Sequence, residues 1–415
     1  MNNGIRRVVI TGVGAVTPVG HNVTESWAAI LAGKSGFANT SEQVDISDMP
    51  IGGVCEVKGW DAAEKVGRKE SRRMDRFQQF VQIAAAEAMA QSGLQVTDDN
   101  RHRIGTYMGT GVGGVQTLIE TEHVLQDKGH RRVGPFAITM IMPNGAAGMT
   151  AIEYGLQGPA MTTTTACAAG TDGVGNGFMA VRMGIVDAAI VGGSEAPVTR
   201  VTMASFAKAG ALSKRTEGTP SPFDKDRDGF VAGEGAGVLV IETLENAKAR
   251  GANILAEIVG FGQTCDAFHI TAPVSSGAGA TRAIRDAIAM GGYQPEDVDY
   301  MNAHGTGTRL NDSIETTAIK AALGEHAYKV AVSSTKSMTG HGMGATGAIE
   351  TVFCAMALRD QIAPPTISLV EADPECDLDY VSGGARKMPI NLVTNHAFGF
   401  GGHNAVLALA KYQEE

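Results

Sequence analysis

The sequence predicts an α/β protein built from two similar halves. Its 415 residues include 54 glycines, 43% hydrophobic residues and 5% aromatic residues, a composition that suits an α/β protein with many tight turns. Several segments of the first half recur in the second half in the same order. In both halves an expected helix leads to a strand that ends in Gly-Thr-Gly, at 109–111 and at 305–307. These three observations favour a duplicated fold in which strands and helices alternate.

The internal repeat defines the expected halves. One set of residues recurs at a constant spacing, first as Ala84, Ala88, Gly93 and Gln95 and then as Ala283, Ala287, Gly292 and Gln294. A second set recurs at its own constant spacing, first as Gly170, Ala180, Arg182 and Ile185 and then as Gly347, Ala357, Arg359 and Ile362. We therefore expect a first half at 1–253, which carries the longer insertions, and a second half at 254–415.

Composition and charge narrow the classes of function. A formal net charge of −10 argues against nucleic acid as the main partner. The five cysteines are odd in number and widely spaced, so we expect no disulfide framework, no metal site and a reducing compartment. No apolar run reaches membrane-spanning length, and residues 1–7 lack an apolar signal core. The sequence therefore predicts a cytoplasmic protein that does not insert into membranes.

The first expected strand, at 7–14, ends in a glycine turn similar to a dinucleotide-binding motif. The third glycine of that motif is missing, because Thr17-Pro18 stands where it would fall and a proline there obstructs the helix. The glycine-rich turn at 109–114 follows another strand, but alone it is an equally weak signature. A nicotinamide dehydrogenase is therefore disfavoured, and a nucleotide titration without binding would exclude it.

Residues 64–90 are expected to form one long helix. Its apolar face contains Phe77, Phe80, Val81, Ala84, Ala85 and Ala88. Basic residues precede this face at steps of three and four and form a basic stripe, made of Lys65, Arg68, Lys69, Arg72, Arg73 and Arg76. The stripe is either a solvated helix face or a docking surface for an acidic partner, and the pattern leaves both open.

The segment 162–173 is expected to join a strand to a helix. A run of threonines at 162–165 favours a strand, and Val174, Phe178 and Val181 follow at helical spacing. Cys167 then lies at the helix N-terminus, where unpaired N–H groups and the helix dipole favour a thiolate over a thiol. The alternative is a small buried hydrophobic residue, as most free cysteines are.

Three strand ends in the second half carry residues suited to catalysis. His304 stands where a strand meets a glycine-rich turn, and Lys336 and His341 follow another strand. Phe400 lies in a glycine-flanked turn that can aim a backbone N–H at a ligand. Each histidine alone is more often structural than catalytic. Together with Cys167, at strand ends of a duplicated α/β fold, these residues describe one site.

The chain resembles the β-ketoacyl-acyl-carrier-protein synthases of the type II elongating class. The similarity runs from Arg7-Val-Val-Ile-Thr-Gly to Phe400-Gly-Gly, and its motifs are Thr165-Ala-Cys167, the segment 222–235, His304-Gly-Thr-Gly-Thr, Lys336-Ser-Met-Thr-Gly-His341 and Gly399-Phe-Gly-Gly402. The resemblance implies a thiolase-like fold, with two duplicated α/β halves whose mixed five-stranded sheets are layered with helices. The family's complete Cys-His-His set is present, and an inactive chain-length-factor subunit would lack the cysteine.

The resemblance implies an acyltransferase that condenses acyl- and malonyl-carrier protein with loss of carbon dioxide. Cys167 would hold the acyl chain, and the backbone N–H groups of Cys167 and Phe400 would form the oxyanion hole. His304 and His341 would stabilise the enolate, each donating an N–H without needing to be charged. Lys336 would orient both histidines and pair with Glu350.

The same resemblance implies residues for binding the substrates. Thr306 and Thr308, assisted by Thr271, would bind the amides of a pantetheine arm, and Phe400 would act as a gate for the acyl chain. The acyl pocket would be lined by Val112, Phe136 and Phe206. Many relatives carry two bulky apolar residues where this chain has Gly342-Met343, so the resemblance does not carry over a chain-length preference.

The expected partner is acyl carrier protein, an acidic protein in both its acyl and malonyl forms. Its docking surface would be part of the basic stripe, made of Lys65, Arg68 and Lys69, with Arg68 and Lys69 as first choices. The resemblance implies no enzyme-bound cofactor, because phosphopantetheine of the carrier holds the substrates. It also implies a homodimer in which strands of the first half pair across a two-fold axis.

Two alternatives share some of these features. A ketosynthase subunit of a type II polyketide pathway has the same motifs but would need a partner subunit that lacks the cysteine. A non-catalytic carrier-binding subunit would retain its function in vivo after Cys167→Ala. Activity of the purified chain alone on long acyl chains would exclude the first alternative.

Overall fold

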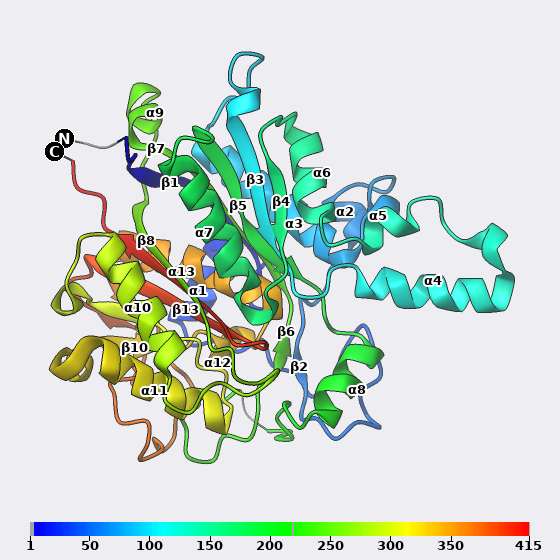
Figure 1. Ribbon diagram of the computed structural model, residues 1–415. Helices are drawn as coiled ribbons and strands as arrows, with labels where there is room; N and C mark the ends of the chain where they lie inside the picture. The colour runs from blue at the N-terminus through cyan, green and yellow to red at the C-terminus, as the bar shows by residue number, and fades with distance from the viewer. Residues whose placement is uncertain (1–3, 218–219, 415) are drawn as a thin grey trace.

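The structure is a computed structural model that describes residues 4–217 and 220–414. The prediction that residues 1–7 lack an apolar signal core therefore lies partly outside the described residues. A ten-stranded sheet forms its centre (Figure 1). The first half supplies β1 (Val8–Val16), β3 (Ile104–Gly109), β4 (Ala160–Thr163), β5 (Ala188–Glu195) and β7 (Gly235–Thr243). The second half supplies β8 (Ala256–Cys265), β9 (Tyr300–Asn302), β10 (Ala331–Ser333), β13 (Leu392–Gly399) and β14 (His403–Ala410).

The strand order repeats between the halves. It runs β4-β3-β5-β7-β1 in the first half and β10-β9-β13-β14-β8 in the second. In each half the first two pairings from the outer edge are parallel, with β3 or β9 as the shared strand. The two pairings that follow are antiparallel. The two five-stranded sheets join where β1 pairs with β8 over Val8–Ile10. This repeat confirms the duplicated α/β fold, while the boundary between 253 and 254 stays a prediction.

Helices cover both faces of these sheets. On the outer side, α3 (Arg76–Ser92) and α6 (Gly145–Tyr154) pack on the first half, and α10 (Ala278–Met290) packs on the second, with α11 (Arg309–Leu323) against it. Between the halves, α7 (Ala169–Arg182) and α13 (Thr346–Asp360) contact strands of both (Figure 1). These two helices form the central layer of the molecule.

The peripheral elements complete the chain. The helices among them are α1 (Val23–Leu31), α2 (Ala62–Lys65), α4 (Val115–Lys128), α5 (Ala137–Ile141), α8 (Arg200–Lys208), α9 (Leu244–Ala249) and α12 (Lys336–Thr339). The short strands are β2 (Val54–Cys55), β6 (Ala232–Gly233), β11 (Ile362–Ala363) and β12 (Arg386–Lys387). No helix among the described residues combines the length and the apolar character needed to cross a membrane.

The two central helices approach each other at a pair of glycines. A Cβ on Gly170 would lie 2.6 Å from the carbonyl oxygen of Gly344, and a Cβ on Gly347 would lie 2.0 Å from the hydroxyl oxygen of Thr171. Only glycine permits such a close approach of backbones. Gly170 and Gly347 are the pair matched in the sequence repeat, so the repeat marks the contact that brings the two halves together at the centre.

The prediction of a single long helix at 64–90 is wrong. The chain forms α2, then a 3₁₀ turn at Ser71–Arg73, and only then α3. Gly67 adopts a φ of 89°, which helices do not contain. A capping box at Asp75 then begins α3, because its carboxylate accepts from the N–H of Phe77 and its own N–H donates to Gln78.

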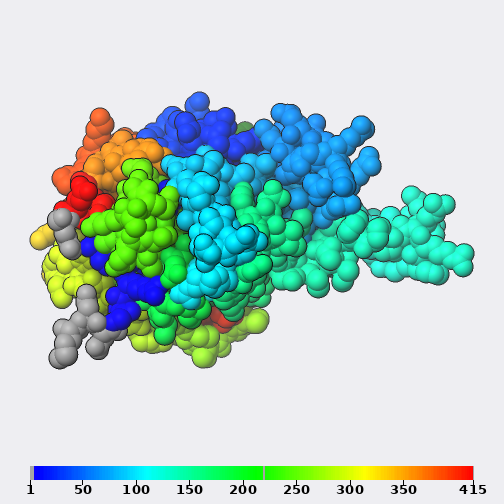
Figure 2. All heavy atoms as spheres, turned by 90° about the horizontal axis from the view of Figure 1, so that it is seen from above, coloured from blue at the N-terminus to red at the C-terminus, as the bar shows by residue number. Residues whose placement is uncertain are grey.

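One part of the first half projects from the rounded body. Helices α4 and α5 and the loop between them form this arm, which Figures 1 and 2 show extending well beyond the rest of the molecule. Apolar side chains on the arm are exposed to solvent in the single chain, including Leu118, Leu125 and Ile138. Exposed apolar surfaces of this kind are typical of interaction sites.

Candidate active site

The expected strand-to-helix junction at Cys167 is confirmed. Strand β4 ends at Thr163, a 3₁₀ turn spans Ala166–Ala168, and α7 begins at Ala169. Ala166 has a φ of 51°, a left-handed conformation that non-glycine residues seldom adopt and that often occurs at functional sites. The turn leaves Cys167 partly exposed, at the edge of a cavity.

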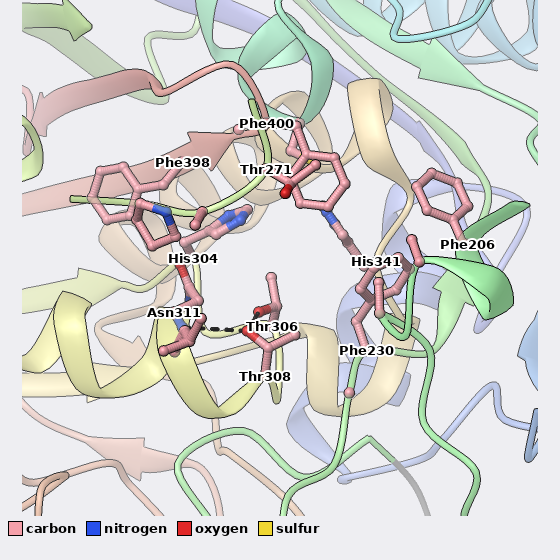
Figure 3. A pocket seen from close by; sticks show the side chains of 18 of the residues that line it. Phe206, Phe230, Thr271, His304, Thr306, Thr308, Asn311, His341, Phe398 and Phe400 are labelled. Atoms are coloured by element: carbon pink, nitrogen blue, oxygen red, sulfur yellow. Dashed lines mark hydrogen bonds between the residues drawn. The ribbon is translucent and has the colours of Figure 1, made fainter. Parts of the chain in front are cut away.

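Both halves of the chain line this cavity, whose volume is about 380 Å³. The first half contributes Cys167 and Phe206, and the second contributes His304, His341 and Phe400. Figure 3 shows side chains from both halves gathered around this space. The structure therefore brings the cysteine and both histidines into one site, as the sequence analysis predicted.

The two histidines are buried and uncharged. Their ring centroids lie 5.3 Å apart, with the rings nearly perpendicular at 87°. Burial lowers the pKa of both His304 and His341 well below its usual value, and the charge of Lys336 lowers it further. Both rings are therefore neutral imidazoles at pH 7, each with one N–H to donate.

Lys336 lies beside the histidines in a fully buried ion pair. Its Nζ donates to Oε1 of Glu350 at 2.7 Å, and each side chain is 1% exposed. The expected pairing of these two residues is thus present. Burial raises the pKa of Glu350 to about 7, while Lys336 acts in the opposite direction. Since Lys336 begins α12 and Glu350 lies on α13, the pair also ties these two helices together.

The charge state of Cys167 differs from the prediction. We expected the start of α7 to favour a thiolate. Although part of Cys167 is open to the cavity, the surrounding protein shields it from bulk water, and this burial raises the pKa of its thiol to about 11. The backbone N–H of Phe400 and the charge of Lys336 lower the pKa of this thiol, but by less than burial raises it. The physical reason is that desolvation of the anion outweighs these partial and distant charges. Cys167 is therefore a thiol at neutral pH in the free protein.

The other side of the cavity carries hydroxyl groups. The Oγ1 atoms of Thr306 and Thr308 lie 3.0 Å apart, and Thr271 also lines the space (Figure 3). The phenyl ring of Phe400 is partly exposed, at 37%, on the short connection between β13 and β14. The threonines and Phe400 therefore line the same cavity, while their roles in binding a pantetheine arm and in gating stay predictions.

Two of the three residues expected in the acyl pocket lie outside the cavity of the single chain. Phe206 is among its lining residues, whereas Val112 and Phe136 are not. Both side chains are exposed to solvent. Phe136 directly precedes α5 of the projecting arm, and the guanidinium of Arg73 lies 4.8 Å from its ring centre.

Glu195 is a buried residue near the site that the sequence analysis missed. At the end of β5, its carboxylate accepts from Oγ1 of Thr110 at 2.8 Å and from the N–H groups of Val112 and Gly344, both at 3.1 Å. It therefore connects the loop after β3 with the segment that follows His341. The available signal in the sequence was the single charged residue of a strand made mostly of small and apolar residues.

The basic stripe is only partly a surface. Arg68 and Lys69 are exposed, and neither forms an ion pair with another residue in the described part of the chain. Lys65 is half-buried at the end of α2. Arg76 instead points inward, where it pairs with the buried Glu234 at 2.7 Å. Within the described part of the chain, the stripe therefore offers Arg68, Lys69 and Arg72 as exposed cations without an ion pair.

Fold and site together define a class of protein. A doubled mixed sheet encloses two central helices, and the cysteine before one of them shares a cavity with two neutral histidines from the other half. This combination defines a condensing enzyme with a thiolase-like fold.

Comparison with known proteins identifies the family. Residues 5–247 match the N-terminal domain of β-ketoacyl synthases, and residues 255–370 match their C-terminal domain. The chain belongs to the β-ketoacyl synthase family. It is 49% identical to the 3-oxoacyl-[acyl-carrier-protein] synthase 2 of a Synechocystis species, over 98% of this chain and 99% of that protein. Proteins of the same name from Staphylococcus aureus are 46% identical over equal shares.

Solved structures of related enzymes have the same fold. The ishigamide ketosynthase/chain length factor superimposes with a TM-score of 0.91 at 37% identity, over 99% of this chain and 100% of that one. A type II polyketide ketosynthase in complex with its acyl carrier protein superimposes with a TM-score of 0.90 at 33% identity, over the same shares. These similarities confirm the thiolase-like fold expected from the sequence.

Proposed function

We propose that this protein is a 3-oxoacyl-[acyl-carrier-protein] synthase of type II fatty acid synthesis, and that Cys167, His304 and His341 perform its reaction. The observation that carries the assignment of these residues is their position around one cavity, although they come from different halves of the chain. Relatives of the same name, 46% to 49% identical over nearly the whole chain, support the activity itself.

The first stage transfers an acyl group to Cys167. The sulfur attacks the thioester carbonyl of an acyl-carrier protein, a C–S bond to Cys167 forms, and the C–S bond to the pantetheine sulfur breaks. Because Cys167 starts as a thiol, its proton must leave, and it ends on the released pantetheine thiol. The N–H of Phe400, which already hydrogen-bonds to the sulfur, and the N–H of Cys167 would hold the oxyanion.

The second stage forms the carbon–carbon bond. Malonyl-carrier protein loses carbon dioxide, and the electron pair of the broken C–C bond becomes an enolate on the thioester. His304 and His341 donate N–H groups to the enolate oxygen, as neutral imidazoles can. The carbanion attacks the acyl carbonyl, the C–S bond to Cys167 breaks, and a 3-oxoacyl-carrier protein two carbons longer leaves. The Cys167 thiolate takes up one proton from solvent, which restores the thiol.

Lys336 acts on both histidines without taking a proton. Burial lowers the pKa of His304 and His341, and the Lys336 ammonium, fixed by Glu350 at 2.7 Å, lowers it further, so both rings stay neutral. The hydroxyls of Thr306, Thr308 and Thr271 would bind the amides of the pantetheine arm. Phe400, between two glycines, would swing to admit the acyl chain into a pocket that Phe206 helps to line.

The substrates would arrive on acyl carrier protein, in its acyl and malonyl forms, with no other cofactor held by the enzyme. Arg68 and Lys69 offer two exposed charges to this acidic partner, and Lys65 lies close to them in sequence. A related ketosynthase has been solved in complex with its own acyl carrier protein. That complex supports carrier docking as the way in which substrates reach the cavity.

We also infer that the protein is a homodimer. Strand β4 is the edge of the sheet next to β3, and Met161 on it is 56% exposed. An edge strand presents unpaired N–H and C=O groups that a second copy can bond. The projecting arm would then reach the partner and bring Phe136 toward the partner's acyl pocket, which explains why this residue is exposed in one chain.

Product analysis with the purified protein tests the proposed function. We expect acyl- and malonyl-carrier protein to give 3-oxoacyl-carrier protein two carbons longer, with release of carbon dioxide and no second subunit. Cys167→Ala should abolish this product. Absence of product from the intact protein would contradict the proposal, and product only after a cysteine-free partner subunit is added would favour the polyketide alternative. A sedimentation mass of one chain would contradict the homodimer.

A further inference from the structure

A third buried histidine lies behind the active site. His396, on β13, has a fully buried side chain and does not line the cavity. Its Nδ1 lies 3.2 Å from Oε1 of Glu315, and its Nε2 lies 2.9 Å from Oγ1 of Thr394. Both ring nitrogens therefore have partners, and one of them is a buried carboxylate.

Glu315 holds the backbone of the catalytic segment. From α11, its Oε1 accepts the N–H of His304 and its Oε2 accepts the N–H of Gly305, each at 2.7 Å. A backbone N–H can only donate, so both carboxylate oxygens act as acceptors. The Nδ1 of His396 faces the same Oε1, and two acceptors would repel each other there. Nδ1 must therefore carry a proton, which leaves Nε2 to the hydroxyl of Thr394.

This contact matters because the segment after β9 is irregular. Gly305 has a φ of 36°, and its carbonyl oxygen accepts from Oγ of Ser334 at 2.6 Å. The position of the His304 ring thus depends on side chains that hold this turn. Glu315 supplies two of those hydrogen bonds, and the contact of His396 with its Oε1 fixes the orientation of the carboxylate.

The same histidine lies on the strand that leads to the gate. Phe398, two residues further along β13, has its ring centre 5.7 Å from that of His396 and 5.8 Å from that of His304. Figure 3 shows Phe398 beside His304 at the cavity wall. Before it reaches Phe400, this strand therefore acts on His304 directly through Phe398 and indirectly through His396 and Glu315.

We propose that His396 is a positioning residue for the decarboxylation half of the reaction, acting through Glu315 on the backbone of His304. This inference rests on the proposed function. A merely structural role for His396, as a satisfied polar group in the core, would affect stability but would not separate the two half reactions.

Three variants distinguish these roles. His396→Leu removes both nitrogens, whereas His396→Asn keeps an N–H that can reach Glu315. Val406→Ala is the matched control: Val406 is the fully buried residue directly opposite His396 on β14, and its apolar side chain donates nothing to Glu315. The control should lower stability without changing the balance between the half reactions.

The experiment measures two rates for each folded variant. One is acylation of Cys167 by acyl-carrier protein, followed by protein mass, and the other is carbon dioxide release from malonyl-carrier protein. For His396→Leu we expect decarboxylation to fall about 10- to 100-fold while acylation changes less than about 3-fold, since misplacing a catalytic group by about 1 Å has an effect of that size. His396→Asn should stay within about 3-fold of the parent in both rates.

Equal loss of both rates in His396→Leu, or no loss in either, would overturn the proposal. If His396→Leu does not fold, Thr394→Val decides, because it removes the hydroxyl that faces Nε2 at nearly constant volume. We then expect the decarboxylation rate to fall selectively by about 3-fold or more, which is a fraction of the full positioning effect. An unchanged ratio of the decarboxylation rate to the acylation rate would overturn the proposal. Failure of the proposed function is separate, since it would appear as no decarboxylation by the parent.

Discussion

Replacing Gly170 with alanine tests whether the close crossing of the two central helices assembles the site. A Cβ on Gly170 would lie 2.6 Å from the carbonyl oxygen of Gly344 and 2.9 Å from the backbone nitrogen of Ala348. Ordinary contacts begin at 3.4 Å, so the two backbones must separate by roughly 0.8 Å. No side-chain rotation can relieve the contact, because both neighbours are backbone atoms.

Two effects should follow from this separation. The free energy of unfolding should fall by about 1–3 kcal/mol, the usual effect of overpacking a core. Cys167 precedes α7, and His341 lies shortly before α13, so the same movement changes the distance between the nucleophile and this histidine. A displacement of about 1 Å lowers a catalysed rate by about 100-fold, and we expect a loss of product formation close to that size.

Urea unfolding and the rate of 3-oxoacyl product formation measure the two effects. Gly383→Ala is the matched control, because a Cβ there meets no atom within 4 Å; its stability should stay within about 1 kcal/mol of the parent and its rate should not change. A Gly170→Ala protein with the stability and rate of the parent would refute the reasoning. Loss of stability at full activity would show that the crossing supports the fold without placing Cys167.

Three further predictions concern charge. Because burial raises the pKa of Cys167 to about 11, its alkylation by iodoacetamide should rise about tenfold per pH unit between about pH 7 and 10, and a plateau below about pH 8 would contradict this. Glu350→Leu should lower the free energy of unfolding by about 3–5 kcal/mol, since it leaves the Lys336 ammonium buried without its partner. Adding Lys336→Met to this variant should restore most of the lost stability. Equal instability of the single and double variants in urea unfolding would argue against a coupled pair. Exchanging Arg68 and Lys69 for glutamate should raise the KM for acyl-carrier protein about tenfold or more at low salt, with little change in kcat, and an unchanged KM would remove these residues from the docking surface.

The sequence predicted the parts of the molecule that local pattern determines. The strand-to-helix junction at Cys167 and the strand ends at His304 and His341 are visible as motifs, because turns need particular residues. The match between Gly170 and Gly347 also predicted the duplication, because a close helix crossing allows little else at either position. Conversely, the basic spacing continued across the break at Gly67, so the pattern indicated one helix where the structure has two.

Other features depend on residues that are distant along the chain. Glu315 accepts a hydrogen bond from His396, and Glu195 accepts hydrogen bonds from both Thr110 and Gly344. A local sequence pattern cannot predict partners that lie this far apart along the chain. The charge state of Cys167 was predicted wrongly for the same reason. The residues that exclude water from its sulfur come partly from the second half of the chain. The position of Cys167 before a helix was therefore not enough to predict the pKa of its thiol.

Mapping the acyl intermediate tests the central claim most directly, namely that Cys167 is the nucleophile of a two-stage condensation. The purified protein is incubated with acyl-carrier protein, digested and analysed by mass, before and after malonyl-carrier protein is added. We predict an acyl mass increase on the peptide that contains Cys167, which disappears on addition of malonyl-carrier protein as 3-oxoacyl-carrier protein forms. An adduct on Cys55 or Cys265 instead, or one on Cys167 that malonyl-carrier protein does not remove, would contradict the account.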